Sequence, residues 1–299
     1  MVRQPRQAIA LLVHNDIFQI NSLIKKLEKD FDLYIHVDKK CDIDPTLIAS
    51  KNVWKEYKVH WGSYDIVQST LFLYKKILST KIPYTHVILL SADSLPVKSN
   101  EYIYSYLSAN AGTSFMENIP SDEAGLDRRR LLWYKEDLRT NVKRIKKLTN
   151  PFKIIRWLQK KLNINRSTKG FERTGSQWTI LALRHVQHLI DYGKFSKFRF
   201  TAIPDESFVQ NHFDCYRLPF STKLIYAHWP NKRSFSPDFV DEATCLSLLN
   251  SPFLFARKFE TGSGGSCRNT IIKSDSQEKV LVSNNLISDR FGQSKPYYD

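Results

Sequence analysis

The chain has 299 residues, of which 42% are hydrophobic and 25% charged, a composition ordinary for a folded protein and too apolar for a disordered one. Its formal net charge of +15 is unusual, and no apolar run approaches the ~18–20 residues of a membrane span. The apolar run 8–13 is too short for a signal-peptide core, and the four widely spaced cysteines disfavour a zinc site or a disulfide framework. We therefore expect a cytoplasmic protein.

Strand and helix patterns alternate through the N-terminal half. Apolar and β-branched runs predict strands at 8–13, 33–37, 53–59 and 85–91, with helical stripes over 17–27 and 66–78. This alternation predicts a doubly wound α/β fold, with a Rossmann-like, mostly parallel central sheet flanked by helices. Farther along, we expect short strands at 113–117 and 177–183 and a short helix at 207–213.

A basic segment follows at 138–171, with eleven Lys and Arg residues and no acidic one. Its apolar residues recur every three or four positions, which predicts an amphipathic helix broken near Pro151. Such a helix packs on its own domain, lies on an anionic membrane surface, or binds nucleic acid. We interpret 1–260 as one domain carrying this segment as an insertion, and the polar, Gly- and Ser-containing residues 261–299 as a loosely attached tail.

Polar clusters follow the predicted strands, and open α/β sheets bind ligands beyond the carboxyl ends of their strands. Asp38 closes the second strand, where a carboxylate accepts hydrogen bonds from a nucleobase or ribose, or pairs with the neighbouring lysines. Asp93 and Ser94 follow the most apolar strand, and either a ligand contact or a local turn explains them. Ser63 is placed to cap the second helix, whose N-terminus would attract an anion.

The segment Pro204-Asp205-Glu206 offers two adjacent carboxylates. One of them could accept a proton from an attacking hydroxyl, or both could be residues favoured at a helix N-terminus. Arg233 and Lys258 are the side-chain types that neutralise a diphosphate without a metal, although both could be surface residues. Asp42-Ile43-Asp44 spells the D-x-D of many sugar-nucleotide enzymes, but it runs into Pro45, so we expect no metal site there.

Taken in this order, the clusters resemble the core-2/I-branching β-1,6-N-acetylglucosaminyltransferase and peptide O-xylosyltransferase family. The matching pieces span about residues 8–260 and are His36-Val-Asp-Lys-Lys40, Trp61-Gly-Ser63, Leu89-Leu-Ser91 with Pro96-Val-Lys-Ser99, Gly175-Ser-Gln-Trp178, Pro204-Asp-Glu206 and Phe255-Ala-Arg-Lys-Phe259. The resemblance implies a GT-A-type fold and inverting transfer of a sugar from a UDP-sugar to a hydroxyl of a glycan acceptor, with no metal or other cofactor.

The resemblance also implies roles for single residues. Glu206 would be the catalytic base, and Glu117 and Trp178 would bind the acceptor. The donor UDP-sugar would be bound by a larger set, in which Asp38 contacts the uracil and two cations hold the diphosphate: Asp38, Ser63, Asp93, Ser94, Arg233 and Lys258. Ser94 stands where the family has an Asp, which departs from the family pattern.

Vertebrate members of this family carry a membrane anchor and several disulfides, and this sequence shows neither. The expectation is therefore a bacterial cytoplasmic enzyme of surface polysaccharide or lipooligosaccharide synthesis, transferring N-acetylglucosamine or xylose and binding no nucleic acid. As a hypothesis, 138–171 docks it peripherally on anionic membrane carrying a lipid-linked acceptor. Two alternatives stay open: a hydrolase using Glu206 and Asp93 as paired carboxylates, and a non-enzymatic nucleic-acid binder driven by the positive charge.

Overall fold

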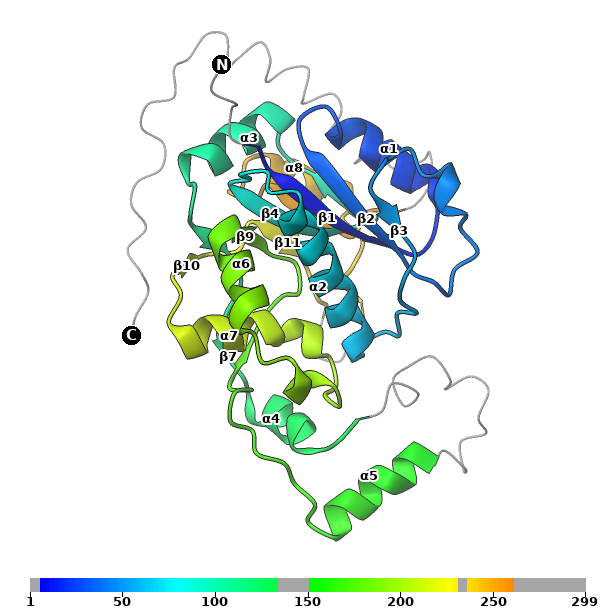
Figure 1. Ribbon diagram of the computed structural model, residues 1–299, viewed down its shortest axis with the longest axis vertical. Helices are drawn as coiled ribbons and strands as arrows, with labels where there is room; N and C mark the ends of the chain where they lie inside the picture. The colour runs from blue at the N-terminus through cyan, green and yellow to red at the C-terminus, as the bar shows by residue number, and fades with distance from the viewer. Residues whose placement is uncertain (1–5, 134–150, 231–235, 261–299) are drawn as a thin grey trace.

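The computed structural model describes residues 6–133, 151–230 and 236–260, and a seven-stranded sheet forms its centre (Figure 1). The strand order is β10-β6-β9-β4-β1-β2-β3. The strands are β1 (Ala8–Val13), β2 (Asp32–Val37), β3 (Val53–Trp54), β4 (His86–Ser91), β6 (Ser114–Phe115), β9 (Ile180–Ala182) and β10 (Phe220–Ser221). The fold class predicted from the sequence, an α/β fold with a mostly parallel sheet flanked by helices, is confirmed.

The parallel part of the sheet holds its most apolar strands. β1 pairs in parallel with both β2 and β4, and every residue of β4 is buried. β9 runs antiparallel between β4 and β6. Neighbouring parallel strands are usually joined by a helix that crosses over one face of the sheet. β9 is instead connected to β6 by a long segment, and a connection of that kind does not fix the direction of β9.

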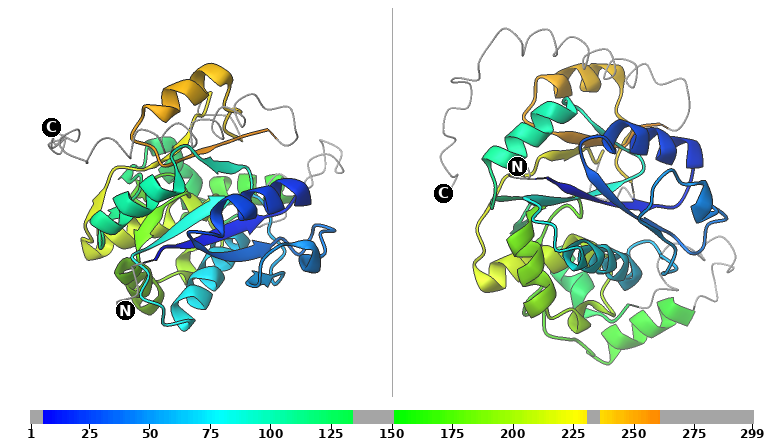
Figure 2. Two further views of the ribbon diagram at one scale, coloured as in Figure 1. Left: turned by 90° about the horizontal axis from the view of Figure 1, so that it is seen from above. Right: turned by 45° about the horizontal axis from the view of Figure 1, so that its top comes forward.

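Helices cover both faces of the sheet (Figure 2). On one face lie α1 (Ile17–Leu27) and α3 (Asn100–Ala109), and on the other α2 (Tyr64–Ser79) and α6 (Leu183–Tyr192). The predicted apolar stripes of the first two helices are confirmed. α1, for example, buries Ile20, Leu23, Ile24 and Leu27. These faces and the sheet form one hydrophobic core.

A second sheet, of three strands, lies beside the first in the order β11-β12-β5. Its strands are β5 (Ser94–Pro96), β11 (Ile225–Ala227) and β12 (Phe255–Arg257). β12 and β5 are antiparallel, and Ser94 lies opposite Arg257. This register brings the turn after β4 next to a segment more than 160 residues away in sequence.

The remaining elements lie outside the two sheets and the four helices named above. They are a 3-10 helix η1 (Pro45–Leu47), the hairpin of β7 (Ile119–Pro120) with β8 (Arg173–Thr174), α4 (Glu123–Arg130), α5 (Pro151–Lys161), two further 3-10 helices, η3 (Ser196–Phe198) and η4 (Pro204–Glu206), α7 (Phe208–Tyr216) and α8 (Glu242–Leu249). Figure 1 shows α5 beyond α4, far from the central sheet. None of the described helices is both long and apolar enough to span a bilayer.

Three predictions from the sequence are refined by these elements. The strands predicted at 53–59 and 113–117 are each two residues long, and the strand predicted at 177–183 is three. In the basic segment a helix begins at Pro151, where the pattern predicted a break. The rest of that segment up to residue 150, and the predicted tail 261–299, lie outside the described residues.

Candidate active site

A cavity of about 380 Å³ lies beyond the carboxyl ends of β1, β2 and β4, the place expected for a ligand in this kind of sheet. We call it the central cavity. It is lined by groups from segments distant in sequence, among them His14, His36, Asp38, Asp93, Trp178, Glu206, Arg257 and Lys258. Five of the predicted site residues are therefore brought together: Asp38, Asp93, Trp178, Glu206 and Lys258.

Asp38 is held by the loop that follows β3. Its Oδ1 accepts hydrogen bonds from the backbone N–H groups of Lys40 at 2.8 Å and Val59 at 3.0 Å. The Nζ of Lys40 lies 3.8 Å from Oδ2, so the local pairing considered from the sequence exists. In the stretch after β3 that the sequence predicted as strand, the backbone N–H groups of Tyr57 and Val59 donate to the side chains of His36 and Asp38 and not to a neighbouring strand. Only Oδ1 takes the two backbone bonds, and the residue still lines the cavity.

Two histidines lie beside Asp38 in the cavity wall. His36 accepts a hydrogen bond at Nε2 from the backbone N–H of Tyr57, and burial lowers the pKa of His36 to about 4. His14 directly follows β1, and burial lowers its pKa despite the nearby carboxylates of Asp93 and Asp38. Both rings are therefore neutral at pH 7 and add no charge to the cavity.

Asp93 anchors the cationic side of the cavity. Both of its carboxylate oxygens lie 3.2 Å from Nη2 of Arg257, and Lys258 Nζ lies 4.0 Å from Oδ2. Burial of Asp93 opposes its ionisation, but Arg257, a hydrogen bond from Ser91 and Lys258 outweigh burial and hold the pKa of Asp93 below its usual value. The guanidinium of Arg257 also lies over the Trp178 ring, 4.5 Å from its centroid.

The two predicted donor-binding serines are both buried outside the lining of the central cavity. Ser94 is fully buried, and its Oγ lies 3.1 Å from Oγ of Ser91, the residue that hydrogen-bonds Asp93. Ser63 is buried and caps α2 by accepting a hydrogen bond from the N–H of Asp65. Neither serine lines the central cavity.

Two other predicted features lie apart from the cavity or outside the structure. Arg233, the second predicted diphosphate ligand, is outside the described residues. In the D-x-D sequence, Asp44 lies at the start of η1 and accepts a hydrogen bond from the N–H of Thr46, so its carboxylate serves as a cap. Across the described ranges, no group of three or more His, Cys, Asp or Glu side chains is arranged to hold a metal ion.

Glu206 is fixed through its backbone. Its carbonyl accepts hydrogen bonds from Thr174 Oγ1 and from the N–H of Gly175, both at 3.0 Å. Ile203, just before η4, has a left-handed backbone with φ +52°, which is strained for a β-branched residue. Its N–H donates to the carbonyl of Gly62 at 2.7 Å. These contacts fix the carboxylates of η4 at the wall of the central cavity.

Of the two acidic residues of η4, Asp205 is buried and Glu206 is partly exposed. Burial raises the pKa of Glu206; the guanidinium groups of Arg128 and Arg129 oppose this shift, and Glu117 adds to it. Burial and the neighbouring Glu206 raise the pKa of Asp205, and its Oδ1 has no hydrogen-bond partner among the described residues. A carboxyl group with a raised pKa is suited to exchange protons near neutral pH.

Comparison with known proteins now bears on this site. A sequence profile of the Core-2/I-Branching enzyme family matches residues 14–234. The chain belongs to the Core-2/I-Branching enzyme family. This membership confirms the resemblance seen in the sequence.

One curated relative and one solved structure show what the chain is similar to. "Xylosyltransferase oxt" of Drosophila pseudoobscura pseudoobscura is 24% identical over 81% of this chain, which spans only 30% of that protein's length. A structure of 4-diphosphocytidyl-2C-methyl-D-erythritol synthase matches 82% of this chain and 99% of its own, with 11% identity and a TM-score of 0.38.

The two predicted acceptor-binding residues of this Core-2/I-Branching enzyme differ in their placement. Trp178 lines the central cavity beneath Arg257. Glu117 lies next to it, where Oε1 pairs with Lys223 and Oε2 accepts a hydrogen bond from the N–H of Ser176 at 2.9 Å. Glu117 is therefore close enough to influence Glu206, but it is held by its own partners.

Several residues of the site, namely Arg257, His14, Arg128 and Arg129, had no role predicted from the sequence. Arg257 was quoted within a motif but not singled out, and its pairing with Asp93 comes from the register of β5 with β12. His14 had a usable signal, because it follows β1 as Asp38 follows β2. Arg128 and Arg129 line a small pocket of about 110 Å³ together with Glu206. We call it the connecting pocket.

Proposed function

We propose that this chain is an inverting, metal-independent glycosyltransferase that moves N-acetylglucosamine or xylose from a UDP-sugar to a hydroxyl of a glycan acceptor. The observation that carries the proposal is the meeting of Asp38, Lys258 and Glu206 around one cavity. These residues come from three segments that the sequence separates by more than 50 residues each. A base, a cation and a nucleoside-binding carboxylate are the groups that such a transfer needs.

In the proposed reaction, the acceptor oxygen attacks the anomeric carbon on the face opposite the diphosphate. Glu206 takes the proton of that hydroxyl while the bond from the anomeric carbon to the phosphate oxygen breaks. The electron pair leaves with UDP, and Lys258, with Arg233 as a second cation, stabilises the negative charge that develops there. Asp38 accepts a hydrogen bond from the uracil. One displacement inverts the anomeric centre.

The contacts of Asp93 argue against the alternative of a hydrolase with paired carboxylates. In that reaction one carboxylic acid protonates the leaving group, and the second carboxylate attacks the sugar or activates a water. The raised pKa of Glu206 would suit the acid, but the oxygens of Asp93 are already engaged: both lie 3.2 Å from Nη2 of Arg257, and Oδ1 also accepts a hydrogen bond from Ser91. Asp93 is better suited to position Arg257 and Lys258 than to attack a sugar or a water.

The test separates binding from chemistry. Unfolding of the purified protein is followed thermally with a panel of nucleotide sugars, with and without EDTA, since a bound ligand stabilises the folded state. We expect Glu206→Gln to keep the stabilisation by UDP and to lower transfer by roughly 10²–10⁴-fold, the usual contribution of a general base. Lys258→Ala should weaken UDP binding, whereas Lys75→Ala, an exposed control on α2, should not. Activity that is lost in EDTA and restored by Mn²⁺ would contradict metal independence.

We also propose that this is a cytoplasmic bacterial enzyme that works on a lipid-linked acceptor at an anionic membrane. Ile154 and Leu158 of α5 and Leu162, directly after its end, are spaced four apart and are exposed, which fits an apolar stripe in a basic segment. Sedimentation with phosphatidylglycerol vesicles but not with phosphatidylcholine vesicles is expected. Leu158→Ser with Leu162→Ser should reduce it, and equal sedimentation with both lipids would contradict the proposal.

A further inference from the structure

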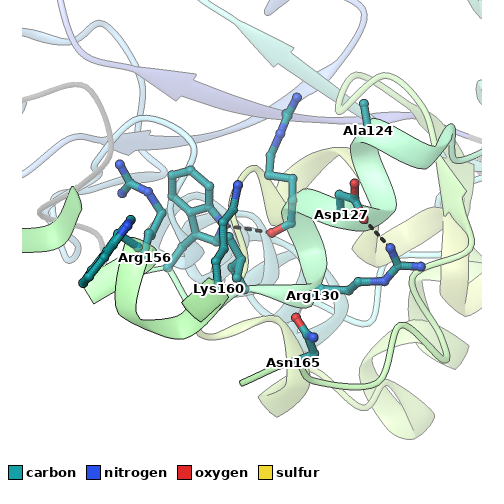
Figure 3. A pocket seen from close by; sticks show the side chains of 10 residues that line it. Ala124, Asp127, Arg130, Arg156, Lys160 and Asn165 are labelled. Atoms are coloured by element: carbon teal, nitrogen blue, oxygen red, sulfur yellow. Dashed lines mark hydrogen bonds and ion pairs between the residues drawn. The ribbon is translucent and has the colours of Figure 1, made fainter. Parts of the chain in front are cut away.

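A second hollow, of about 880 Å³, lies between α4 and α5 (Figure 3). Figure 3 shows Arg156 and Lys160 of α5 on one side and Asp127 and Arg130 of α4 on the other. Its lining is basic and aromatic, with Arg128, Arg130, Arg156, Lys160, Trp133 and Trp157. Asp127 is the one acidic residue in the lining, so the four cations leave the hollow strongly positive.

This α4–α5 hollow adjoins the place where the proposed base lies. Arg128 lines both the α4–α5 hollow and the connecting pocket. Glu206 and Ile203 line both the connecting pocket and the central cavity. The three spaces are therefore in series, with Glu206 at the junction nearest the donor and Arg128 at the junction nearest the α4–α5 hollow.

The lining residues favour a ligand that combines negative charge with a flat, partly apolar body. Arginine binds carboxylate and phosphate oxygens through a planar fork, and lysine adds a point charge. The guanidinium of Arg156 lies 4.6 Å from the centre of the Trp133 ring, and Nε1 of Trp133 donates to the carbonyl of Arg128 at 2.8 Å, so two of these groups are positioned by contacts. The tryptophan faces offer apolar surface to a sugar ring. Arg130 is paired with Glu123 and Asp127. Arg128, Arg156 and Lys160 also line the hollow, where such a ligand would meet them.

We propose that the α4–α5 hollow binds a carboxylate or phosphate group of the glycan acceptor, at a sugar remote from the hydroxyl that reacts. The proposal rests on the proposed function, because it places the acceptor on the side of Glu206 away from the donor. It specifies the acceptor class as an anionic glycan. The long-range attraction of the basic wall would also concentrate such acceptors at the site.

The experiment is calorimetric titration of the whole protein with matched oligosaccharides. One pair is trigalacturonic acid and its methyl ester, and the other is a singly phosphorylated maltotriose and maltotriose. At least one charged member should bind tenfold or more tightly than its neutral partner, and added salt should weaken that binding. If charged and neutral members bind equally in both pairs, the proposal is wrong.

Variants then locate the binding. Arg156→Gln with Lys160→Gln should weaken binding of the charged oligosaccharide by about tenfold or more, a typical loss for charge-assisted hydrogen bonds. Lys160→Gln alone affects an exposed side chain, so folding is not at risk, and it should give a smaller loss of the same kind. Lys75→Gln with Lys169→Gln removes the same charge from exposed positions outside the hollow and should leave binding unchanged. Equal losses in both double variants would indicate a general charge effect and would overturn the proposal.

A last pair of measurements distinguishes the sources of the anion and the two proposals. If the α5 double variant loses binding to phosphatidylglycerol vesicles but keeps binding to the oligosaccharides, the hollow is a lipid headgroup site and the acceptor proposal is overturned. UDP binding is measured in the same samples. Retained UDP binding with no preference for charged oligosaccharides contradicts this inference alone, while a charged-glycan preference without any UDP binding contradicts the proposed function.

Discussion

Replacing Asp93 by Asn tests whether its ion pair holds the cationic side of the central cavity together. At 3.2 Å and an effective dielectric constant of ~20, the attraction between Asp93 and Arg257 is ~5 kcal/mol before desolvation is subtracted. Both side chains are largely buried, and removing one partner of a buried pair typically costs about 3–5 kcal/mol. Asparagine keeps one acceptor oxygen, so we expect a loss of about 3 kcal/mol in the free energy of unfolding.

The assay is chemical denaturation at several pH values, in wild type and variant. The folded pKa of Asp93 is lowered, so the ion pair contributes stability that is present above the ordinary pKa of 3.8 and lost as pH falls through the folded pKa. The difference between the two proteins should therefore be constant from about pH 5 to 8 and shrink below pH 3.8. The double variant with Arg257→Gln should lose less than the sum of the two single losses.

Two results would refute this reasoning. Equal stability of wild type and Asp93→Asn at pH 7 would show that the desolvation of the pair cancels its attraction. Additive losses in the double variant would show that Asp93 and Arg257 act independently, despite their 3.2 Å separation.

Three further predictions concern Glu206 and the backbone that holds it. Because burial raises the pKa of Glu206, the acid limb of the pH–activity profile should be centred well above the ordinary 4.5, and a limb near 4.5 would exclude Glu206 as the base. Because the pKa of Glu206 is raised in the folded state, its contribution to stability is fully present below pH 4.5 and is lost as the pH rises through the folded pKa. Glutamine does not titrate, so the stability of Glu206→Gln should fall less than that of wild type between pH 4.5 and 8. At Gly175 an added Cβ would lie 2.1 Å from the carbonyl oxygen of Glu117, so Gly175→Ala should cost about 1–3 kcal/mol and lower activity. Gly125→Ala, in α4, meets only side-chain atoms and should have a smaller effect on thermal unfolding.

The elements that the sequence predicted best are those whose positions follow from local hydrophobic patterns. The strand 8–13 and the helix over 17–27 coincide with β1 and α1, because their apolar spacing reflects burial on one sheet. The direction of β9 and the shortness of β3 depend on distant partners and leave no periodic signal. Local patterns are enough to predict the buried strands of the sheet, whereas the direction of a strand depends on tertiary contacts.

The candidate site was predictable to a similar degree. Asp38, Asp93 and Glu206 were found because carboxylates at strand ends and after a proline are conspicuous in sequence. Their contact partners could not be predicted. The pairing of Asp93 with Arg257, for example, depends on the antiparallel register of β5 with β12. The raised pKa of Glu206 depends on burial, which a dipeptide of acidic residues does not indicate.

The left-handed backbone at Ile203 implies a trade-off between endurance and catalysis. An isoleucine in that conformation costs of the order of 1–3 kcal/mol, which glycine or asparagine would largely recover. Such a replacement would yield a more stable protein with a more flexible backbone in the turn before Pro204. Selection for resistance to heat alone would favour that change, whereas the isoleucine keeps the carboxyl group of Glu206 beside a more rigid turn.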